Sequence, residues 1–336
     1  MKPSAQSVAV IGAGVVGLTT AVRLLQAGKS VTVYAAARTP GTTSDRAGAV
    51  FTPTKSGEDA RIAAWTARSF EVLRGFAEQG AAAPVRGVRM GLSREFFLKP
   101  KPEQPWWRGM AAEYRRLTGL HASHADGYEI VVPRMDITRY IPSLEAWAAS
   151  LGAAFVEGRV ARFEDLFARG HEVVVNCSGL GARELAGDAR MFPMRGQIVA
   201  APNDIGLDVA LHEEVDSRTE ATYLFPFQDH IVLGGTYEER VGEPETSEAA
   251  LAAVVERCRG LLRKLEIPGA DRLARTRLRQ WAGLRPARVV DGNPEAVRLE
   301  MERVGGGVVV HNYGHGRAGI TLAWGCAEEA ARLAGG

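Results

Sequence analysis

The residues whose spacing most clearly points to chemistry are three glycines near the amino terminus: Gly12, Gly14 and Gly17. They come directly after a short apolar run at residues 8–11, which predicts a buried strand. Residues 18–27 then carry apolar side chains at helical spacing, and residues 31–34 predict a second strand. In such a strand–helix–strand unit the glycines let the backbone approach a pyrophosphate at the positive end of the helix. The pattern predicts dinucleotide binding.

The position at which such a unit usually binds ribose lacks its carboxylate. An acidic residue is expected at the end of the second strand, but the sequence there is Ala35-Ala36-Ala37-Arg38. This absence argues against NAD. Arg38 could bind the 2′-phosphate of NADP, or it could be a solvated side chain, and the sequence leaves both interpretations open.

Arg285 and Tyr223 are candidates for binding a small acid. Arg285 lies between Leu284 and Pro286, so a stiff backbone holds it and its guanidinium could bind a carboxylate through two hydrogen bonds. A structural ion pair explains the same pattern. Tyr223 begins an apolar run, where it could equally be a core tyrosine with a hydrogen-bonded hydroxyl.

Other reactive side chains do not form a recognisable site. His311 and His315 have a spacing that could bind zinc on a helix, but Gly314 between them breaks any helix, so no metal is expected. Cys177 follows an apolar strand, where packing is the simpler interpretation. The sequence contains no hydrolase or nucleotide-triphosphatase motif.

Composition limits the class of protein. The 336 residues include 41 Lys and Arg and 39 Asp and Glu, which gives a net charge of +2. This balance gives no reason to expect nucleic acid or a membrane as a partner. Hydrophobic residues make up 46% of the chain, as in a folded protein of about two domains. Three scattered cysteines and the absence of a leader-like apolar segment predict a cytoplasmic protein.

The elements that must position these residues repeat one pattern. Short apolar strands end in glycine or other small residues near positions 12, 42, 177 and 314. Ligands of open α/β sheets bind at that end of the strands. We therefore expect an α/β fold in which a Rossmann-like cofactor domain contains an inserted strand-rich (α+β) substrate domain. The predicted cofactor domain comprises residues 1–50, 150–195 and 281–336, and the predicted substrate domain comprises 51–149 and 196–280.

Taken together, these segments resemble the D-amino-acid oxidase family, which includes D-aspartate oxidase. The stretches that carry the resemblance are, in chain order, Val10 to Leu18, Thr42-Thr43-Ser44-Asp45, Val175-Asn176-Cys177-Ser178-Gly179, Arg195-Gly196-Gln197, Leu233-Gly234-Gly235-Thr236, Gly283-Leu284-Arg285-Pro286, His311-Asn312-Tyr313-Gly314-His315-Gly316 and Trp324-Gly325-Cys326. The resemblance implies a flavoprotein oxidase with FAD in place of a nicotinamide cofactor. A homodimer is expected on the same ground.

The resemblance also implies which residues contact FAD. The pyrophosphate is expected at Gly12, Ala13, Gly14, Val15, Val16 and Gly17, and phosphate and ribitol oxygens at Thr42, Thr43 and Ser44. Ala49 and Val50 are expected at the isoalloxazine, Val160 at adenine, and Ser178 and Gly179 along the cofactor. Gly316, Ala318, Gly319, Ile320 and Thr321 are expected beside the flavin pyrimidine, where a helix amino terminus would stabilise the charge of the reduced ring. Ala36 departs from the acidic residue that family members often have.

For the substrate, the family pattern assigns the carboxylate to Arg285 and Tyr223 and the amine to the backbone carbonyl of Arg317. The implied reaction transfers hydride from a D-amino acid to flavin N5 without a catalytic side chain. Its products are a 2-oxo acid, ammonia and, after reaction with dioxygen, hydrogen peroxide. Tyr237 in the side-chain pocket favours neutral or apolar substrates.

Other functions stay open at this point. Arg218 and Arg317 keep D-aspartate oxidation open as an alternative. A glycine- or sarcosine-type FAD amine oxidase, an NADP-dependent dehydrogenase and a flavin-binding redox sensor are the remaining alternatives.

Overall fold

The first of two sheets contains the predicted strand–helix–strand unit. The structure is a computed structural model that describes residues 5–53, 59–101, 105–111, 113–294 and 296–335. The first sheet has the strand order β14-β15-β7-β1-β2-β6. Its strands are β1 (Ser7–Ile11), β2 (Ser30–Ala35), β6 (Ala154–Glu157), β7 (Val173–Asn176), β14 (Arg298–Val304) and β15 (Gly307–Tyr313). β14 runs antiparallel to β15, and the other neighbouring strands are parallel.

The turn between β1 and α1 (Val15–Gln26) confirms the predicted unit. A Cβ atom on Gly17 would lie 1.9 Å from the carbonyl oxygen of Gly12, so only glycine lets the helix start this close to the strand. The helix begins at Val15, earlier than the predicted residue 18. The apolar periodicity misses this first turn because it includes the last glycine of the motif.

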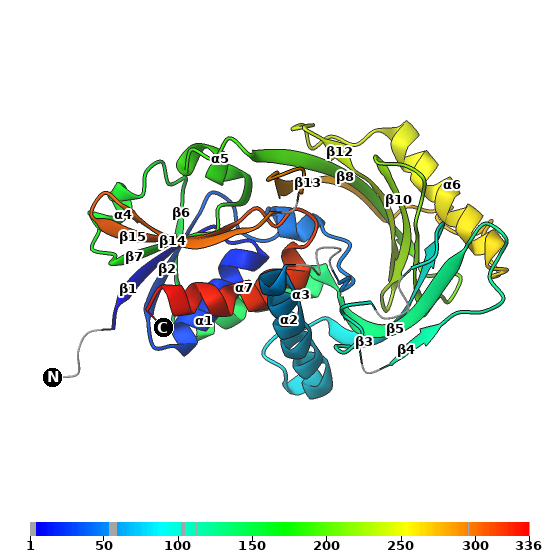
Figure 1. The fold of residues 1–336 in the computed structure, drawn as a ribbon, viewed down its shortest axis with the longest axis horizontal. Coiled ribbons are helices and arrows are strands. Elements are labelled where there is room, and N and C mark those ends of the chain that lie inside the picture. The colour runs from blue at the N-terminus through cyan, green and yellow to red at the C-terminus, as the bar shows by residue number, and fades with distance from the viewer. Residues whose placement is uncertain (1–4, 54–58, 102–104, 112, 295, 336) are drawn as a thin grey trace.

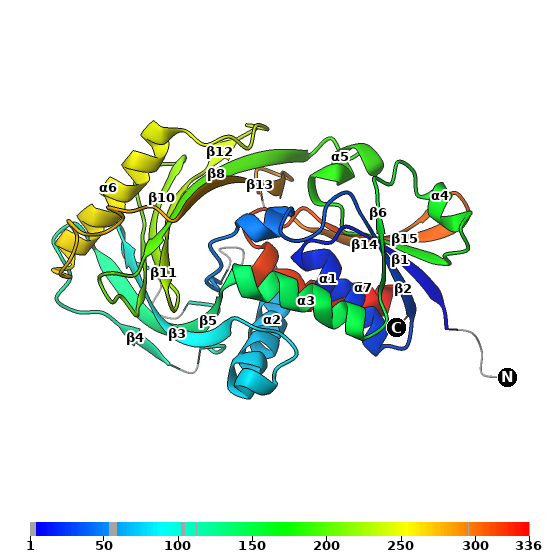
Figure 2. The same cartoon turned by 180° about the vertical axis from the view of Figure 1, so that it is seen from behind.

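Helices from distant parts of the chain pack together beside the first sheet (Figures 1 and 2). They are α1, α2 (Ala60–Gln79), α3 (Ile137–Ser150) and α7 (Gly319–Leu333). Trp324 is fully buried among them, and its indole N–H donates to the Tyr140 hydroxyl at 2.9 Å. Shorter helical segments are η1 (Thr43–Arg46), η2 (Gly80–Ala82), α4 (Glu164–Phe167), η3 (Gly179–Gly181) and α5 (Ala182–Leu185). Of the helices in the described ranges, none has the length and apolar character needed to cross a bilayer.

The second sheet lies at the other end of the molecule's long axis (Figure 1). Its strand order is β12-β8-β11-β10-β9-β3-β5-β4. A further strand, β13, lies off this order and pairs antiparallel with β8. The strands are β3 (Val88–Phe97), β4 (Tyr114–Arg116), β5 (Asp126–Met135), β8 (Met191–Pro202), β9 (Ala210–Glu213), β10 (Glu220–Pro226), β11 (His230–Thr236), β12 (Glu238–Glu239) and β13 (Arg279–Arg288). The amphipathic helix α6 (Glu248–Lys264) covers this sheet with Leu251, Val254 and Leu261, all fully buried.

The structure distributes the chain differently from the predicted segments in two places. β13, most of which belongs to the predicted cofactor segment 281–336, pairs along its whole length with β8 in the second sheet. The helices α2 and α3, from the predicted substrate segment 51–149, pack on α7 and α1. These pairings do not show where one domain ends and the other begins, so the predicted domain boundaries stay a prediction.

The close packing of α7 on α2 generates a test of the fold. A Cβ atom on Gly325 would lie 2.3 Å from backbone atoms of Trp65, whereas one on Gly75, also in this helix pair, has no atom within 4 Å. We expect Gly325→Ala to lower the free energy of unfolding by about 2–3 kcal/mol because the two backbones must separate. Gly75→Ala is the matched control and should raise it by about 0.5–1 kcal/mol. Urea unfolding measures both, and equal effects would contradict this packing.

Candidate active site

The segments that the sequence predicted at strand ends line one cavity. It has a volume of about 790 Å³, within the range of small-molecule sites, and both sheets contribute to its walls. The predicted site residues that line it are Gly12, Gly14, Val15, Val16, Thr42, Thr43, Ser44, Ala49, Val50, Ser178, Gly179, Tyr223, Tyr237, Arg285, Gly316, Arg317, Ala318, Gly319, Ile320 and Thr321. Parts of the chain that are far apart in sequence thus meet around one space.

The amino terminus of α1 forms one end of this cavity. Its first turn contains no acidic residue, and its N-cap Gly14 provides no capping side chain, so backbone N–H groups remain for an anion. The Val15 N–H donates to the Ser44 hydroxyl at 2.8 Å, which holds the loop of η1 against the helix. Asp45 fixes that loop by accepting from the N–H and the hydroxyl of Thr42 at 2.8 and 2.7 Å. This end fits a pyrophosphate.

Small residues in the turn after β2 line another part of the cavity. Ala35, Ala36 and Ala37 line it. Arg38 instead pairs with Glu145 at 2.7 Å, and its guanidinium lies 4.3 Å from the centre of the Phe155 ring. The structure therefore gives Arg38 a partner in α3, and the backbone of residues 35–37 is left to meet the adenosine end of a cofactor.

A second helix amino terminus reaches the cavity at Gly316 to Thr321. The first turn of α7 has no acidic residue, and its N-cap Ala318 provides no capping side chain. His315 precedes this segment and is 2% exposed, and within the described part of the chain its Nε2 atom has no hydrogen-bond partner. Burial lowers the pKa of His315 to about 4, so the ring is neutral near pH 7. The helix end and a neutral imidazole fit an uncharged or anionic heterocycle, as the flavin ring system is.

Arg285 and Tyr223 lie together in the second-sheet wall. The Arg285 guanidinium lies over Gly196, where a Cβ atom would be 2.2 Å from both terminal nitrogens, and it donates to the Thr236 carbonyl at 3.0 Å. Burial raises the pKa of Tyr223, and the neighbouring Arg285 opposes that rise. Among the described residues Arg285 has no carboxylate partner. This arrangement leaves a cation and a phenol available for an acid group.

Aromatic side chains surround this pair. Phe225 stacks on Tyr223 with ring centres 4.4 Å apart and an angle of 15° between the rings. The guanidinium carbons of Arg285 and Arg317 each lie 5.0 Å from the centre of the Tyr237 ring. Phe225 is not among the residues predicted for the site, although its position two residues after Tyr223 in a strand places both side chains on one face.

Three predicted cofactor residues do not line the cavity. Ala13 is 2% exposed within the first-sheet core, and Gly17 packs under Gly12. Val160 packs against a separate cluster that includes Tyr34. The structure therefore gives Ala13 and Gly17 a packing function in the glycine turn, and it does not bring Val160 to the cavity wall.

The cavity with its two helix ends defines a protein that can bind a dinucleotide cofactor. The chain belongs to the DAO family of FAD-dependent oxidoreductases, whose model matches residues 7–333. It is 41% identical to a D-amino-acid oxidase of Rubrobacter xylanophilus over 97% of this chain and 95% of that protein. It is 33% identical to the D-aspartate oxidase of Homo sapiens over 97% of this chain and 94% of that protein. The family confirms the prediction of FAD.

The fold is also similar to that of solved oxidase structures. Glycine oxidase from Geobacillus kaustophilus superposes with a TM-score of 0.74 at 18% identity, covering 98% of this chain and 94% of that chain. The predicted combination of a Rossmann-like part with a strand-rich part is confirmed.

The buried His315 predicts a pH dependence of stability. The pKa of His315 is lower in the folded than in the unfolded chain. The contribution of the neutral ring to the free energy of unfolding is therefore complete above about pH 6.5, and it is lost as the pH falls toward the pKa of the folded chain. We expect acidification from about pH 7 to about pH 5 to cost the FAD-saturated wild type about 2 kcal/mol more than His315→Gln. Urea unfolding at both pH values measures this, and parallel losses would contradict a neutral buried His315.

Proposed function

We propose that the protein oxidises neutral, apolar D-amino acids to 2-oxo acids, with FAD as its electron carrier and dioxygen as the final acceptor. The observation that carries this proposal is the half-buried Arg285 guanidinium, which has no carboxylate partner in the described ranges and lies beside the Tyr223 hydroxyl. Two arginines described above do have a carboxylate partner: Arg195 on β8 pairs with Glu238, and Arg38, in the turn after β2, pairs with Glu145. A substrate carboxylate is the natural partner for Arg285.

The cofactor would be held along the cavity by the elements described above. The α1 amino terminus with Ser44 would bind the pyrophosphate, and the segment Gly316 to Thr321 would hold the flavin end. FAD, when bound, accepts two electrons from the substrate and passes them to dioxygen, which becomes hydrogen peroxide.

The protein's own contribution would be orientation. Arg285 and the Tyr223 hydroxyl would hold the carboxylate, and the backbone carbonyl of Arg317 would accept a hydrogen bond from the amine. The substrate, bound with a neutral amine, would lose the hydrogen on Cα as a hydride to FAD and become an iminium ion, and water would then convert this to a 2-oxo acid and ammonium. Three fixed points around Cα select the D-enantiomer, and no side chain has to act as a general base.

The preference for apolar side chains is supported by the wall around the carboxylate site. Val50 and Ile198 line the cavity beside the Tyr223–Phe225 stack. A charged side chain packed against these apolar and aromatic residues would lose hydration that they cannot replace.

Oxidation of acidic D-amino acids is the second candidate, and one observation favours it. The Arg317 guanidinium lies 5.0 Å from the same Tyr237 ring that Arg285 contacts, so a second cation stands near the proposed carboxylate site. A dicarboxylic substrate would use both arginines.

A screen of substrates distinguishes these functions. We expect the FAD-loaded protein to release peroxide and ammonia in equal amounts with D-valine and D-phenylalanine, and none with their L-enantiomers. Turnover of D-aspartate or D-glutamate alone would favour the oxidation of acidic D-amino acids. Turnover of only glycine or sarcosine would favour a glycine- or sarcosine-type amine oxidase. Absence of peroxide with all of these compounds would contradict the proposal.

Removal of the guanidinium tests the carboxylate site itself. Loss of a charge-assisted hydrogen-bonded pair predicts that Arg285→Met raises KM for a D-amino acid by about tenfold to about 150-fold while FAD stays bound. Arg279→Met is the matched control, because Arg279 lies on the same strand, is exposed and stacks on Trp281 at 4.2 Å. Steady-state kinetics with bound-flavin absorbance measures both. A normal KM for Arg285→Met would show that the carboxylate binds elsewhere.

A further inference from the structure

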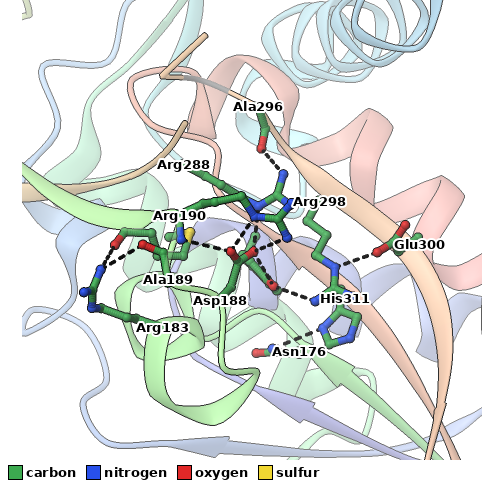
Figure 3. A network of polar contacts seen from close by, with 12 residues as sticks. Asn176, Arg183, Asp188, Ala189, Arg190, Arg288, Ala296, Arg298, Glu300 and His311 are labelled. Carbon is green, nitrogen blue, oxygen red and sulfur yellow. Dashed lines mark hydrogen bonds and ion pairs between the residues drawn. The ribbon is translucent and has the colours of Figure 1, made fainter. Parts of the chain in front are cut away.

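A buried carboxylate outside the cavity joins the two sheets. Asp188 lies in the loop between α5 and β8, and its side chain is 1% exposed. It accepts from the Arg288 Nε at 2.7 Å and from the Tyr313 hydroxyl at 3.1 Å. Figure 3 shows Asp188 with its contacts to Arg190 and Arg288. Arg288 is the last residue of β13 in the second sheet, and Tyr313 is the last residue of β15 in the first.

These two strands lead to the two halves of the active site. β13 carries Arg285 three residues before Arg288, so the alternation of a strand points the two guanidiniums to opposite faces. β15 leads through Gly314 into the segment Gly316 to Thr321, which begins α7. Asp188 thus holds one strand from behind the proposed carboxylate site and the other at the start of the proposed flavin segment.

Direct contacts join the two strand ends. The Gly316 N–H donates to the Pro286 carbonyl at 2.9 Å, and Ala287 pairs with His315 as an isolated bridge. A Cβ atom on Gly314 would lie 2.9 Å from the Cβ atom of Arg288, so the side chain of Arg288 packs directly under the turn. A shift of Arg288 would therefore change where the Gly316 segment lies relative to Arg285.

The network is also charged and stiff. Arg190 pairs with the second oxygen of Asp188 at 2.8 Å, and Arg288 donates further to the Ala296 carbonyl at 3.0 Å. Burial alone would raise the pKa of Asp188, but the hydrogen bonds from Arg190 and Arg288 hold it well below its ordinary value. The Tyr313 hydroxyl also accepts from Arg298 at 3.0 Å. Both strand ends are therefore held by charge-assisted bonds at ordinary pH.

We propose that Asp188 is a positioning residue, which acts through Arg288 and Tyr313 to set the place of Arg285 relative to the segment Gly316 to Thr321. This inference rests on the proposed function, because it assumes that Arg285 binds the substrate carboxylate. Asp188 itself is not among the residues that line the cavity, so it would act only through its neighbours.

The test measures ligand binding and kinetics separately from stability. Asp188→Asn removes the charge, and the double variant Asp188→Asn/Arg288→Gln removes both charges, so that no uncompensated guanidinium is left buried. Arg190→Ala is the matched control: Arg190 pairs with the same carboxylate but its side chain is 52% exposed, and it lies on neither β13 nor β15. Benzoate serves as the carboxylate probe, and the absorbance of bound FAD reports its Kd.

We expect Asp188→Asn and the double variant to retain FAD and to raise both the Kd for benzoate and KM by about tenfold, since misplacement of a binding group by a fraction of an ångström has effects of that size. Arg190→Ala should stay within about twofold of the wild type. If both Asp188 variants also stay within about twofold of wild type in Kd and KM, whatever their loss of stability, Asp188 is only structural and the proposal is overturned.

Tyr313→Phe keeps the proposal testable if the Asp188 variants do not fold. It leaves the Asp188–Arg288 pair intact and removes the hydroxyl that donates to Asp188 and accepts from Arg298. A rise of about threefold or more in the Kd for benzoate is expected, and an unchanged Kd would overturn the proposal. Failure of the proposed function itself would look different, because the wild type would then oxidise no D-amino acid.

Discussion

The proposed function depends most on the placement of a single cation, the guanidinium of Arg285. It lies half-buried in a cavity wall, where a charge is stable only with a partner of opposite sign or with good hydrogen bonds. In the described part of the chain its polar contacts are the Thr236 carbonyl and the neighbouring Tyr223 hydroxyl. This guanidinium has no anionic partner among the described residues, which makes the cavity suited to a ligand with a carboxylate.

The two sheets divide the work that this arrangement requires. The first sheet presents two helix amino termini, those of α1 and α7, which need no charged side chain to stabilise an anion. The second sheet presents Arg285 on β13 beside an aromatic wall, and it leaves space for the guanidinium only because Gly196 has no side chain. The contacts around Asp188 join the two sheets behind this wall, outside the cavity lining.

The sequence predicted the local elements well and the non-local pairings poorly. The β1–α1–β2 unit was predictable because its glycine spacing and apolar periodicity lie within one short stretch. The pairing of β13 with β8 was not, because strand pairing depends on residues far apart in the chain and Arg285 had only a stiff local context. The same limit applies to Arg38, whose partner Glu145 comes from a distant helix, and to the burial of His315.

The most direct test of the central claim is a crystal structure of the FAD-loaded protein with bound benzoate. The account predicts that the carboxylate accepts hydrogen bonds from the Arg285 guanidinium and the Tyr223 hydroxyl, on the wall that faces the flavin. A carboxylate bound elsewhere in the cavity, with Arg285 contacting only the Thr236 carbonyl, would contradict it.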